Sequence, residues 1–228
     1  MRRTGWLWAG AAPGVWGAYT WGSHLLTLAS IWRGSSERRA VGLTFDDGPD
    51  AAFTPAVLDL LAREDVRGTF FLIGERARRA PALARRIAEA GHDLGNHTWS
   101  HTSLWRCGPA RTEREIVDGY HAIADAAGVP PRFFRPPWGK TNLAMFRVTR
   151  RLETPCVFWS VQPESRRPVA PAEQARRGIS RAHPGAIYDL HDADGVPGAG
   201  RRLVECLPAL VAGLRAQGYA LVPLRDLL

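Results

Sequence analysis

The sequence predicts an α/β fold, specifically a distorted (β/α) barrel of about seven parallel strands. From residue 40 to the C-terminus, short apolar runs of strand length alternate with helix signals. The chain has 228 residues, of which 45% are hydrophobic, which is enough for one core in one domain. Six or seven strands suit closure into a barrel, whose active groups would sit at the carboxyl ends of the strands.

The first elements of this alternation have clear boundary signals. Strands are expected over residues 41–45, 68–73 and 92–96, and helices over residues 54–63 and 81–90. Thr54 is expected to cap the first of these helices, with Pro55 at its first helical position. Gly91 is expected to end the second helix.

The later elements follow the same pattern. Strands are expected over residues 155–161, 186–190 and 219–222, and helices over residues 112–128, 171–182 and 202–216. Thr112 and Glu115 have the spacing of a capping box. Residues 132–135 lead into a proline-rich turn, and Gly218 stops the last long helix.

Residues 1–33 are expected to form a hydrophobic anchor or signal segment. No Asp, Glu, Lys or Arg occurs between Thr4 and Trp32, a stretch longer than the ~20 residues that a helix needs to cross a bilayer. A cleaved signal peptide and an apolar arm packed on the domain are the alternatives. Residues 34–39 are expected to be a linker and residues 40–228 the catalytic domain, placed in the cell envelope by export or by membrane association through residues 4–32.

Charge and cysteine content limit the classes of partner and site. Lys and Arg outnumber Asp and Glu by 30 to 22, and the arginines are scattered, which is typical of a solvated surface. No interleaving of basic and aromatic residues suggests a nucleic-acid module, and no obligate protein partner is inferred. Cys107, Cys156 and Cys206 lack Cys-x-x-Cys spacing, so a thiolate metal site is not expected.

Acidic and imidazole side chains follow two of the expected strands. Asp46 and Asp47 end the first strand, and His97 and His101 follow the third. If the two histidines lie on one helical turn, they share one face and can reach one ion. Two imidazoles and a carboxylate suit catalytic zinc and equally non-haem iron, so the ligand set leaves both open.

Four motifs in this order resemble the polysaccharide deacetylases, the carbohydrate esterase family with NodB homology. The resemblance covers roughly residues 40–228 and rests on the segments TFDDGP (44–49), HTWSH (97–101), RFFRPPWG (132–139) and Leu-His (190–191). It implies a NodB-like distorted barrel and a divalent metal, with Zn²⁺ expected first and Co²⁺, Ni²⁺, Mn²⁺ or Fe²⁺ as alternatives.

The resemblance also implies roles for single residues. Asp47, His97 and His101 would bind the metal. Asp46 would be the general base, held by Arg135, and His191 would be the general acid. Pro137, Trp138 and Leu190 would contact the substrate.

Two positions depart from the family pattern. Ser165 and Arg166 stand where the family has an Asp-Trp pair that tunes the acid histidine, and Asp189 replaces a leucine of the acyl pocket. Residues two apart on a strand face the same side, so Asp189 is predicted to replace the missing carboxylate partner of His191. Glu164 is the competing candidate.

The expected function is metal-dependent hydrolysis of an N-acyl group on an amino sugar of a cell-envelope glycan. The alternatives are a lipid-linked sugar deformylase or deacetylase at the membrane, O-deacetylation of a polysaccharide, and a non-catalytic relative that binds glycan or metal.

Overall fold

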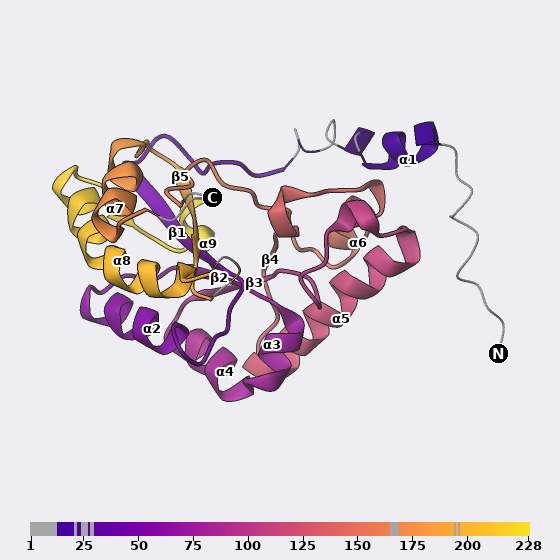
Figure 1. Cartoon of the computed structure of the whole chain (residues 1–228), viewed down its shortest axis with the longest axis horizontal. Coiled ribbons are helices and arrows are strands. Elements are labelled where there is room, and N and C mark those ends of the chain that lie inside the picture. The colour runs from indigo at the N-terminus through magenta and orange to yellow at the C-terminus, as the bar shows by residue number, and fades with distance from the viewer. Residues whose placement is uncertain are drawn as a thin grey trace.

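The computed structural model describes residues 13–20, 22–23, 27, 30–164, 169–193, 195 and 197–228. These residues form one parallel sheet with helices packed around it (Figure 1). The strands are β1 (Ala40–Asp46), β2 (Thr69–Leu72), β3 (Asp93–Asn96), β4 (Phe133–Phe134), β5 (Ala186–His191) and β6 (Ala220–Leu221). Their order is β4-β3-β2-β1-β5, and β6 pairs with the start of β1. The predicted α/β class is confirmed.

The strand predicted over residues 155–161 is replaced by an irregular segment. Cys156 forms an isolated bridge to Phe134 of β4, and Val161 forms one to Tyr188 of β5. The segment therefore joins the two edge strands of the sheet without running as a regular strand. The predicted count of seven strands is not confirmed, because the described residues contain six.

Helices cover the sheet and extend beyond it. They are α1 (Pro13–Thr20), α2 (Thr54–Arg63), α3 (Gly74–Arg79), α4 (Pro81–Glu89), α5 (Pro109–Ala127), α6 (Leu143–Arg151), α7 (Pro171–Ser180), α8 (Ala199–Ala216) and α9 (Leu224–Leu227). The sequence prediction lacks α3, α6 and α9. For α6 a signal exists, because Asn142 caps it and accepts a hydrogen bond from the Met145 amide at 3.0 Å.

The predicted capping box of α5 is wrong. The helix begins at Pro109, so Thr112 and Glu115 lie inside it and are buried. The Thr112 hydroxyl accepts a hydrogen bond from Asn142 Nδ2 at 2.8 Å, and Glu115 accepts bonds from Ser100. Both side chains therefore hold neighbouring segments in place, and the predicted end at Gly128, which has φ of 76°, is confirmed.

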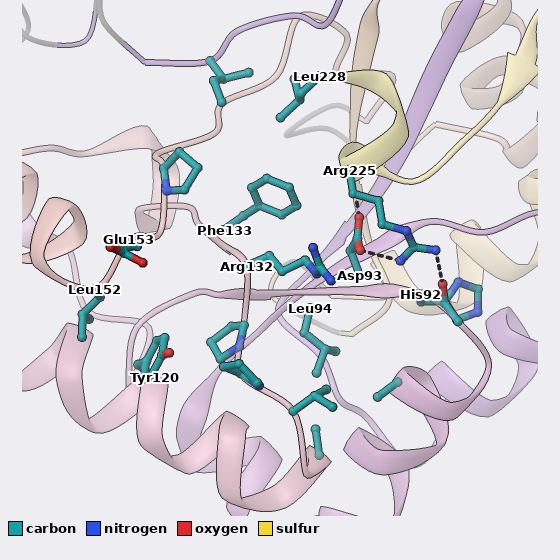
Figure 2. A pocket seen from close by; sticks show the side chains of 18 of the residues that line it. His92, Asp93, Leu94, Tyr120, Arg132, Phe133, Leu152, Glu153, Arg225 and Leu228 are labelled. Carbon is teal, nitrogen blue, oxygen red and sulfur yellow. Dashed lines mark hydrogen bonds and ion pairs between the residues drawn. The ribbon is translucent and has the colours of Figure 1, made fainter.

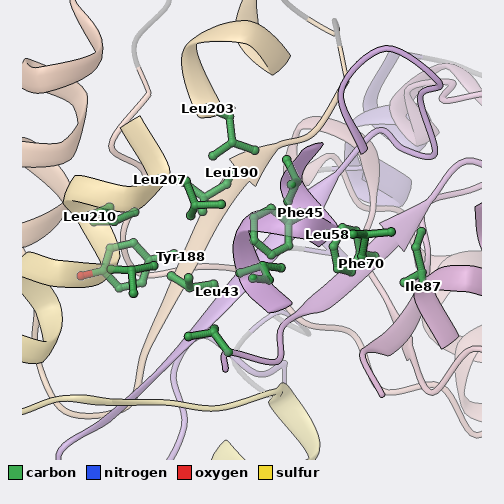
Figure 3. Close-up of a cluster of buried hydrophobic side chains, with 14 of the residues drawn as sticks. Leu43, Phe45, Leu58, Phe70, Ile87, Tyr188, Leu190, Leu203, Leu207 and Leu210 are labelled. Atoms are coloured by element: carbon green, nitrogen blue, oxygen red, sulfur yellow. The ribbon is translucent and has the colours of Figure 1, made fainter. Parts of the chain in front are cut away.

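The main hydrophobic core lies between the sheet and α2, α4 and α8 (Figure 3). Phe45 of β1 and Leu190 of β5 are fully buried in it on the side of Leu203 and Leu207 of α8, and the buried Phe70 of β2 stacks on Phe45 with ring centroids 4.7 Å apart. Each such side chain contributes roughly 2 kcal/mol through burial of apolar surface. Because side chains alternate along a strand, the polar neighbours of these residues face the opposite side of the sheet.

The N-terminal region is described only in part. Residues 1–12, 21, 24–26 and 28–29 of the predicted anchor or signal segment lie outside the described residues. Within the part that the structure describes, no helix combines the length and apolar character needed to span a bilayer. Trp32 stacks on Phe158 with ring centroids 4.2 Å apart, and the hydroxyls of Ser23 and Thr141 are 2.7 Å apart. These described residues thus pack on the domain.

Candidate active site

Three side chains that could hold a metal ion meet at the carboxyl ends of β1 and β3. The Asp47 Oδ1 atom lies 3.0 Å from His101 Nε2 and 3.5 Å from His97 Nε2. Asp47, His97 and His101 each offer one ligand atom, and these atoms lie within 4.8 Å of one another. The expected convergence of this trio is therefore present.

The two histidines converge by a different route from the predicted helical turn. Residues 97–101 form no helix, and Thr98 and His101 adopt positive φ angles of 70° and 54°. Glu115 supports this loop, since its carboxylate accepts bonds from the Ser100 amide at 3.0 Å and hydroxyl at 2.8 Å. Left-handed conformations of this kind cost energy and persist where surrounding contacts hold them.

The pKa shifts of Asp47 and His97 suit metal binding. Burial favours the neutral form of Asp47, but the hydrogen bond to His101 and the neighbouring imidazole charges outweigh it and lower its pKa well below the usual range. Burial lowers the pKa of His97 to about 4. His97 Nδ1 donates to the Arg135 carbonyl at 2.7 Å, which leaves the lone pair of Nε2 facing Asp47. An ionised carboxylate and a neutral imidazole are the forms that a divalent cation requires.

Asp46 faces a fully buried arginine. Arg135 Nη1 donates to Asp46 Oδ1 at 2.7 Å and to the Thr44 hydroxyl at 2.6 Å. Its Nε donates to the Val157 carbonyl at 3.1 Å and its Nη2 to the Phe158 carbonyl at 3.0 Å. The pair predicted from sequence is therefore present, and the guanidinium holds the Asp46 carboxylate in one orientation.

The partner of His191 is Glu164, which corrects the prediction of Asp189. Glu164 Oε2 lies 2.8 Å from His191 Nδ1, and Oε1 accepts from the His191 amide at 3.1 Å. Asp189 shares the face of His191, but its Oδ2 accepts from Gln162 Nε2 at 2.8 Å. The alternation of side chains along β5 correctly predicts the side of the sheet that Asp189 faces. It cannot predict the position of Glu164, because that residue follows the irregular segment. Ser165 and Arg166 lie outside the described residues.

Carboxylates control the pKa of His191. Burial favours its neutral form, but the charge of Asp189 and the hydrogen bond and charge of Glu164 raise its pKa well above the ordinary value. The raised pKa favours the imidazolium form, and the ring lines the cavity.

The three predicted substrate contacts have different outcomes. Trp138 lines the cavity, is 58% exposed, and its ring lies 4.4 Å from that of His101. Leu190 is fully buried in the core and Pro137 is buried in a short 3₁₀ helix, and neither lines the cavity. The prediction is wrong for Leu190 because it alternates with Asp189 and His191 along β5.

Sequence reasoning missed two groups near the site. Trp159 lines the cavity beside Gln162. Asp192 lies below the Asp47 turn and accepts from the Thr54 hydroxyl at 2.5 Å, so Thr54 does not cap α2. A side chain at Gly48 would meet Asp192 oxygens at 2.7 Å, which explains the glycine in this turn.

The site cavity has a volume of about 300 Å³ and is lined by these groups: Asp46, Asp47, His97, His101, Trp138, Trp159, Gln162, Glu164, Asp189, His191, Gly195 and Arg202. A larger hollow of about 990 Å³ lies at the amino ends of β3 and β4 (Figure 2). There Arg225 pairs with Asp93 at 2.6 Å and binds the Gly91 carbonyl at 3.0 Å. Parallel α/β folds place catalytic groups at the carboxyl ends of the strands, which is where the smaller cavity lies.

Comparison with known proteins places the chain in a family. Residues 33–157 match the polysaccharide deacetylase family model. The chain belongs to this family of glycan-modifying hydrolases.

Among its relatives, a peptidoglycan-N-acetylglucosamine deacetylase of Bacillus cereus is 31% identical over 92% of this chain and 75% of its own length. A chitooligosaccharide deacetylase of Bradyrhizobium sp. is 35% identical over 84% of this chain and 92% of its own.

The fold is also similar to solved structures. The crystal structure of the Bc1960 peptidoglycan N-acetylglucosamine deacetylase matches with a TM-score of 0.83 at 31% identity, covering 90% of this chain and 95% of that one. A mutant of a CE4 family pseudoenzyme with restored enzymatic activity matches with a TM-score of 0.79 at 26% identity, covering 87% and 70%.

Proposed function

We propose that this chain hydrolyses the N-acetyl group of an amino sugar in a cell-envelope glycan with the help of a divalent cation. One observation carries the proposal. The Asp47–His97–His101 trio lines one cavity together with Asp46, which Arg135 holds from behind, and with the pair His191–Glu164. Asp46 can accept a proton and His191 can donate one, as amide hydrolysis requires.

The donor set fits a divalent cation, and Zn²⁺ is the first candidate because two imidazoles and one carboxylate leave positions open for substrate. Co²⁺, Ni²⁺, Mn²⁺ and Fe²⁺ suit the same ligands and remain alternatives. When bound, such a cation polarises the acyl carbonyl and makes water acidic enough to lose a proton near neutral pH.

Asp46 has the geometry of the general base. Its Oδ1 is held by Arg135, and its Oδ2 lies 3.8 Å from His97 Nε2, on the side of the trio. The carboxylate can therefore take the proton of a water that attacks the acyl carbon. Arg135 holds Asp46 in one orientation through this contact but does not touch the substrate itself, so we assign it a positioning role.

His191 has the geometry of the general acid. The nitrogen of a sugar amide leaves as a neutral amine only if it receives a proton during the collapse of the tetrahedral intermediate. Glu164 holds the proton on Nδ1 and keeps the ring positively charged. His191 Nε2 can then deliver its proton to the leaving nitrogen.

The relatives support the class of substrate. They include deacetylases named for peptidoglycan N-acetylglucosamine and for chitooligosaccharide. Trp138 stands exposed at the mouth of the cavity, where an aromatic face can support a sugar ring. We therefore propose an N-acetylglucosamine polymer of the envelope as substrate, with the protein exported or held at the membrane through residues 4–32. A lipid-linked amino sugar is the alternative substrate that such an anchor would favour.

The test combines metal analysis with product release. The full chain, freed of metal and reloaded with Zn²⁺, is incubated with N-acetylglucosamine oligomers, and acetate is quantified. Asp46→Asn should keep its metal and lose roughly 10²- to 10⁴-fold in kcat, whereas Asp47→Ala should lose both metal and activity. Asp59→Asn on the surface of α2, where Asp59 pairs with Arg86, is the matched control.

A non-catalytic, glycan-binding relative is the competing function, and the similarity to a CE4 pseudoenzyme favours testing it. In that case the fully metal-loaded wild type binds the oligomers but releases no acyl product from any N-acylated glycan. This result would establish the competing function and contradict the hydrolysis that we propose.

A further inference from the structure

Asp189 presents a buried oxygen that the protein does not satisfy. The residue is 2% exposed and lines the site cavity. Gln162 Nε2 donates to its Oδ2, but Oδ1 receives no hydrogen bond from any residue that the structure describes. Its nearest positive group, Arg135 Nη1, is 3.8 Å away, beyond hydrogen-bond distance. A buried polar atom of this kind is costly unless something in the cavity binds it.

This oxygen lies directly behind the reacting groups. In the sheet register Thr44 pairs with Asp189 and Asp46 pairs with His191, so Asp189 sits one step back from both the base and the acid. Arg135 Nη1 contacts Asp46 at 2.7 Å and approaches Asp189 Oδ1 at 3.8 Å. A carbonyl positioned between Asp46 and His191 therefore places its acyl substituent toward Asp189.

Only the acyl substituent of a glycan can reach this depth. Trp138 at the cavity mouth is 58% exposed, whereas Asp46, Asp47 and Asp189 are 2–3% exposed. The polymer backbone must stay near the mouth because the cavity measures only about 300 Å³. The acyl group is the small substituent that projects from the sugar ring toward the bottom of the cavity.

We infer that Asp189 makes the site selective for N-acyl groups that carry a hydroxyl, of which hydroxyacetyl (glycolyl) is the smallest, over plain acetyl. This inference rests on the proposed function and specifies its substrate. A glycolyl hydroxyl can hydrogen-bond Oδ1, whereas an acetyl methyl leaves that oxygen unpaired. Sites built to bind a hydroxyl discriminate strongly against analogues that lack it, while apolar pockets do not reject an added hydroxyl as strongly.

The protonation of Asp189 does not change this preference. Burial, opposed by His191 and reinforced by Asp46, raises the pKa of Asp189 to about 7. The ionised form accepts a hydrogen bond from the hydroxyl, and the protonated form can donate to the hydroxyl oxygen. A methyl group offers neither interaction.

The experiment compares two substrates that differ by one oxygen atom, N-acetyl- and N-glycolyl-glucosamine oligomers, with the Zn²⁺-loaded full chain. Glycolate and acetate are quantified separately. We expect wild type to prefer the glycolyl substrate by roughly ten- to a hundred-fold in kcat/KM, the effect of one hydrogen bond to a charged group. Asp189→Leu should bring this ratio to about one or below.

Asp189→Asn is the second variant, because it retains an oxygen acceptor and a nearly identical shape if the leucine variant does not fold. It should keep a glycolyl preference smaller than that of wild type. A wild-type ratio at or below one would overturn the inference, as would an Asp189→Leu change that slows both substrates by the same factor. Failure of metal-loaded wild type to hydrolyse either substrate contradicts the proposed function itself, and the inference falls with it.

Discussion

At the scale of single residues, different neighbours suit three clustered aspartates to different roles. Asp46 and Asp47 are adjacent in sequence, yet one faces Arg135 and the other faces two imidazoles. Asp47 keeps a depressed pKa, whereas burial raises that of Asp189 to about 7. Asp47 and Asp189, whose pKa values are pushed apart in this way, can serve as metal ligand and specificity group, while the contact with Arg135 orients Asp46 as the base.

Replacing Glu164 tests how the acid histidine is tuned. Glu164→Gln keeps a hydrogen-bond acceptor for His191 Nδ1 but removes a negative charge 2.8 Å from it. The pKa of His191 should fall, and since the acid must be protonated, the alkaline limb of kcat against pH should move to lower pH by about one unit. The measurement is kcat from pH 6 upward with Zn²⁺ saturating.

Glu64→Gln is the matched control for this change, because Glu64 pairs with Arg215 on the surface at 2.9 Å, away from the cavity. An alkaline limb that stays in place in Glu164→Gln, with only its height reduced, would show that Glu164 orients His191 without setting its charge.

At the scale of elements, the sequence predicts strand ends better than it predicts loops. The strands β1 and β5, which end at Asp46 and His191, contain mostly apolar residues bounded by polar ones, so their carboxyl ends could be predicted directly. The short strand β3, which precedes His97, has one large apolar residue, Leu94. The segment 155–161 has the apolar character of β1 and β5, but it bridges two edge strands and bends between them. Local propensity holds no information on such a tertiary role.

Two further misreadings have the same cause. Thr112 and Glu115 match the spacing of a capping box, but the helix starts one turn earlier because Pro109 and Gly108 begin it. The two histidines match helical spacing, but their loop is held by hydrogen bonds to Glu115 from another element. In both cases side chains from distant parts of the chain decide the local structure.

Side chains alternate along β5, so Leu190 points into the core, whereas Trp138, another predicted substrate contact, is exposed. Replacing each should therefore have a different effect. Leu190→Ala should lower the free energy of unfolding by about 2–5 kcal/mol because it empties a fully buried site, with KM unchanged. Trp138→Ala should raise KM several-fold and leave stability within about 0.5 kcal/mol, because the ring is 58% exposed.

Urea unfolding and steady-state kinetics on both variants measure this contrast. Leu203→Ala, which empties a neighbouring position of the same core from α8, is the control for a purely structural loss. If KM rises in Leu190→Ala and stays unchanged in Leu203→Ala, Leu190 contacts the substrate after all.

At the scale of the whole molecule, the parallel sheet places the reacting groups at one end and a stabilising ion pair at the other. All the groups assigned to the reaction lie at the carboxyl ends of the strands. At the amino ends, Arg225 of α9 is bound to Asp93 of β3, which ties the C-terminus to the sheet. His92 lies beside this ion pair and is buried, and its Nδ1 accepts a hydrogen bond from the Gly68 amide at 3.0 Å. The fold therefore contains a buried neutral histidine that the reaction does not use.

This histidine makes stability depend on pH. Burial, reinforced by the charges of Arg67 and Arg225, lowers the pKa of His92 to about 4 from 6.5. Between pH 6.5 and 4 the unfolded chain binds a proton at this position and the folded chain does not, so stability falls as the pH falls through that window. The loss should reach on the order of 3 kcal/mol, complete below about pH 4.

His92→Asn isolates this contribution, because asparagine places an acceptor near the position of Nδ1 without a titrating ring. His97, whose pKa is also lowered to about 4, contributes in the same direction to both proteins and cancels in their difference. The stability difference between wild type and His92→Asn, measured by urea unfolding in metal-free buffer, should shift by the predicted amount between pH 7 and 4. His121→Asn on the exposed face of α5 should show no such shift. Plots of unfolding free energy against pH for wild type and His92→Asn could instead run parallel over this range. In that case the hydrogen bond from the Gly68 amide does not hold His92 neutral, and the acid sensitivity of the fold must come from its carboxylates.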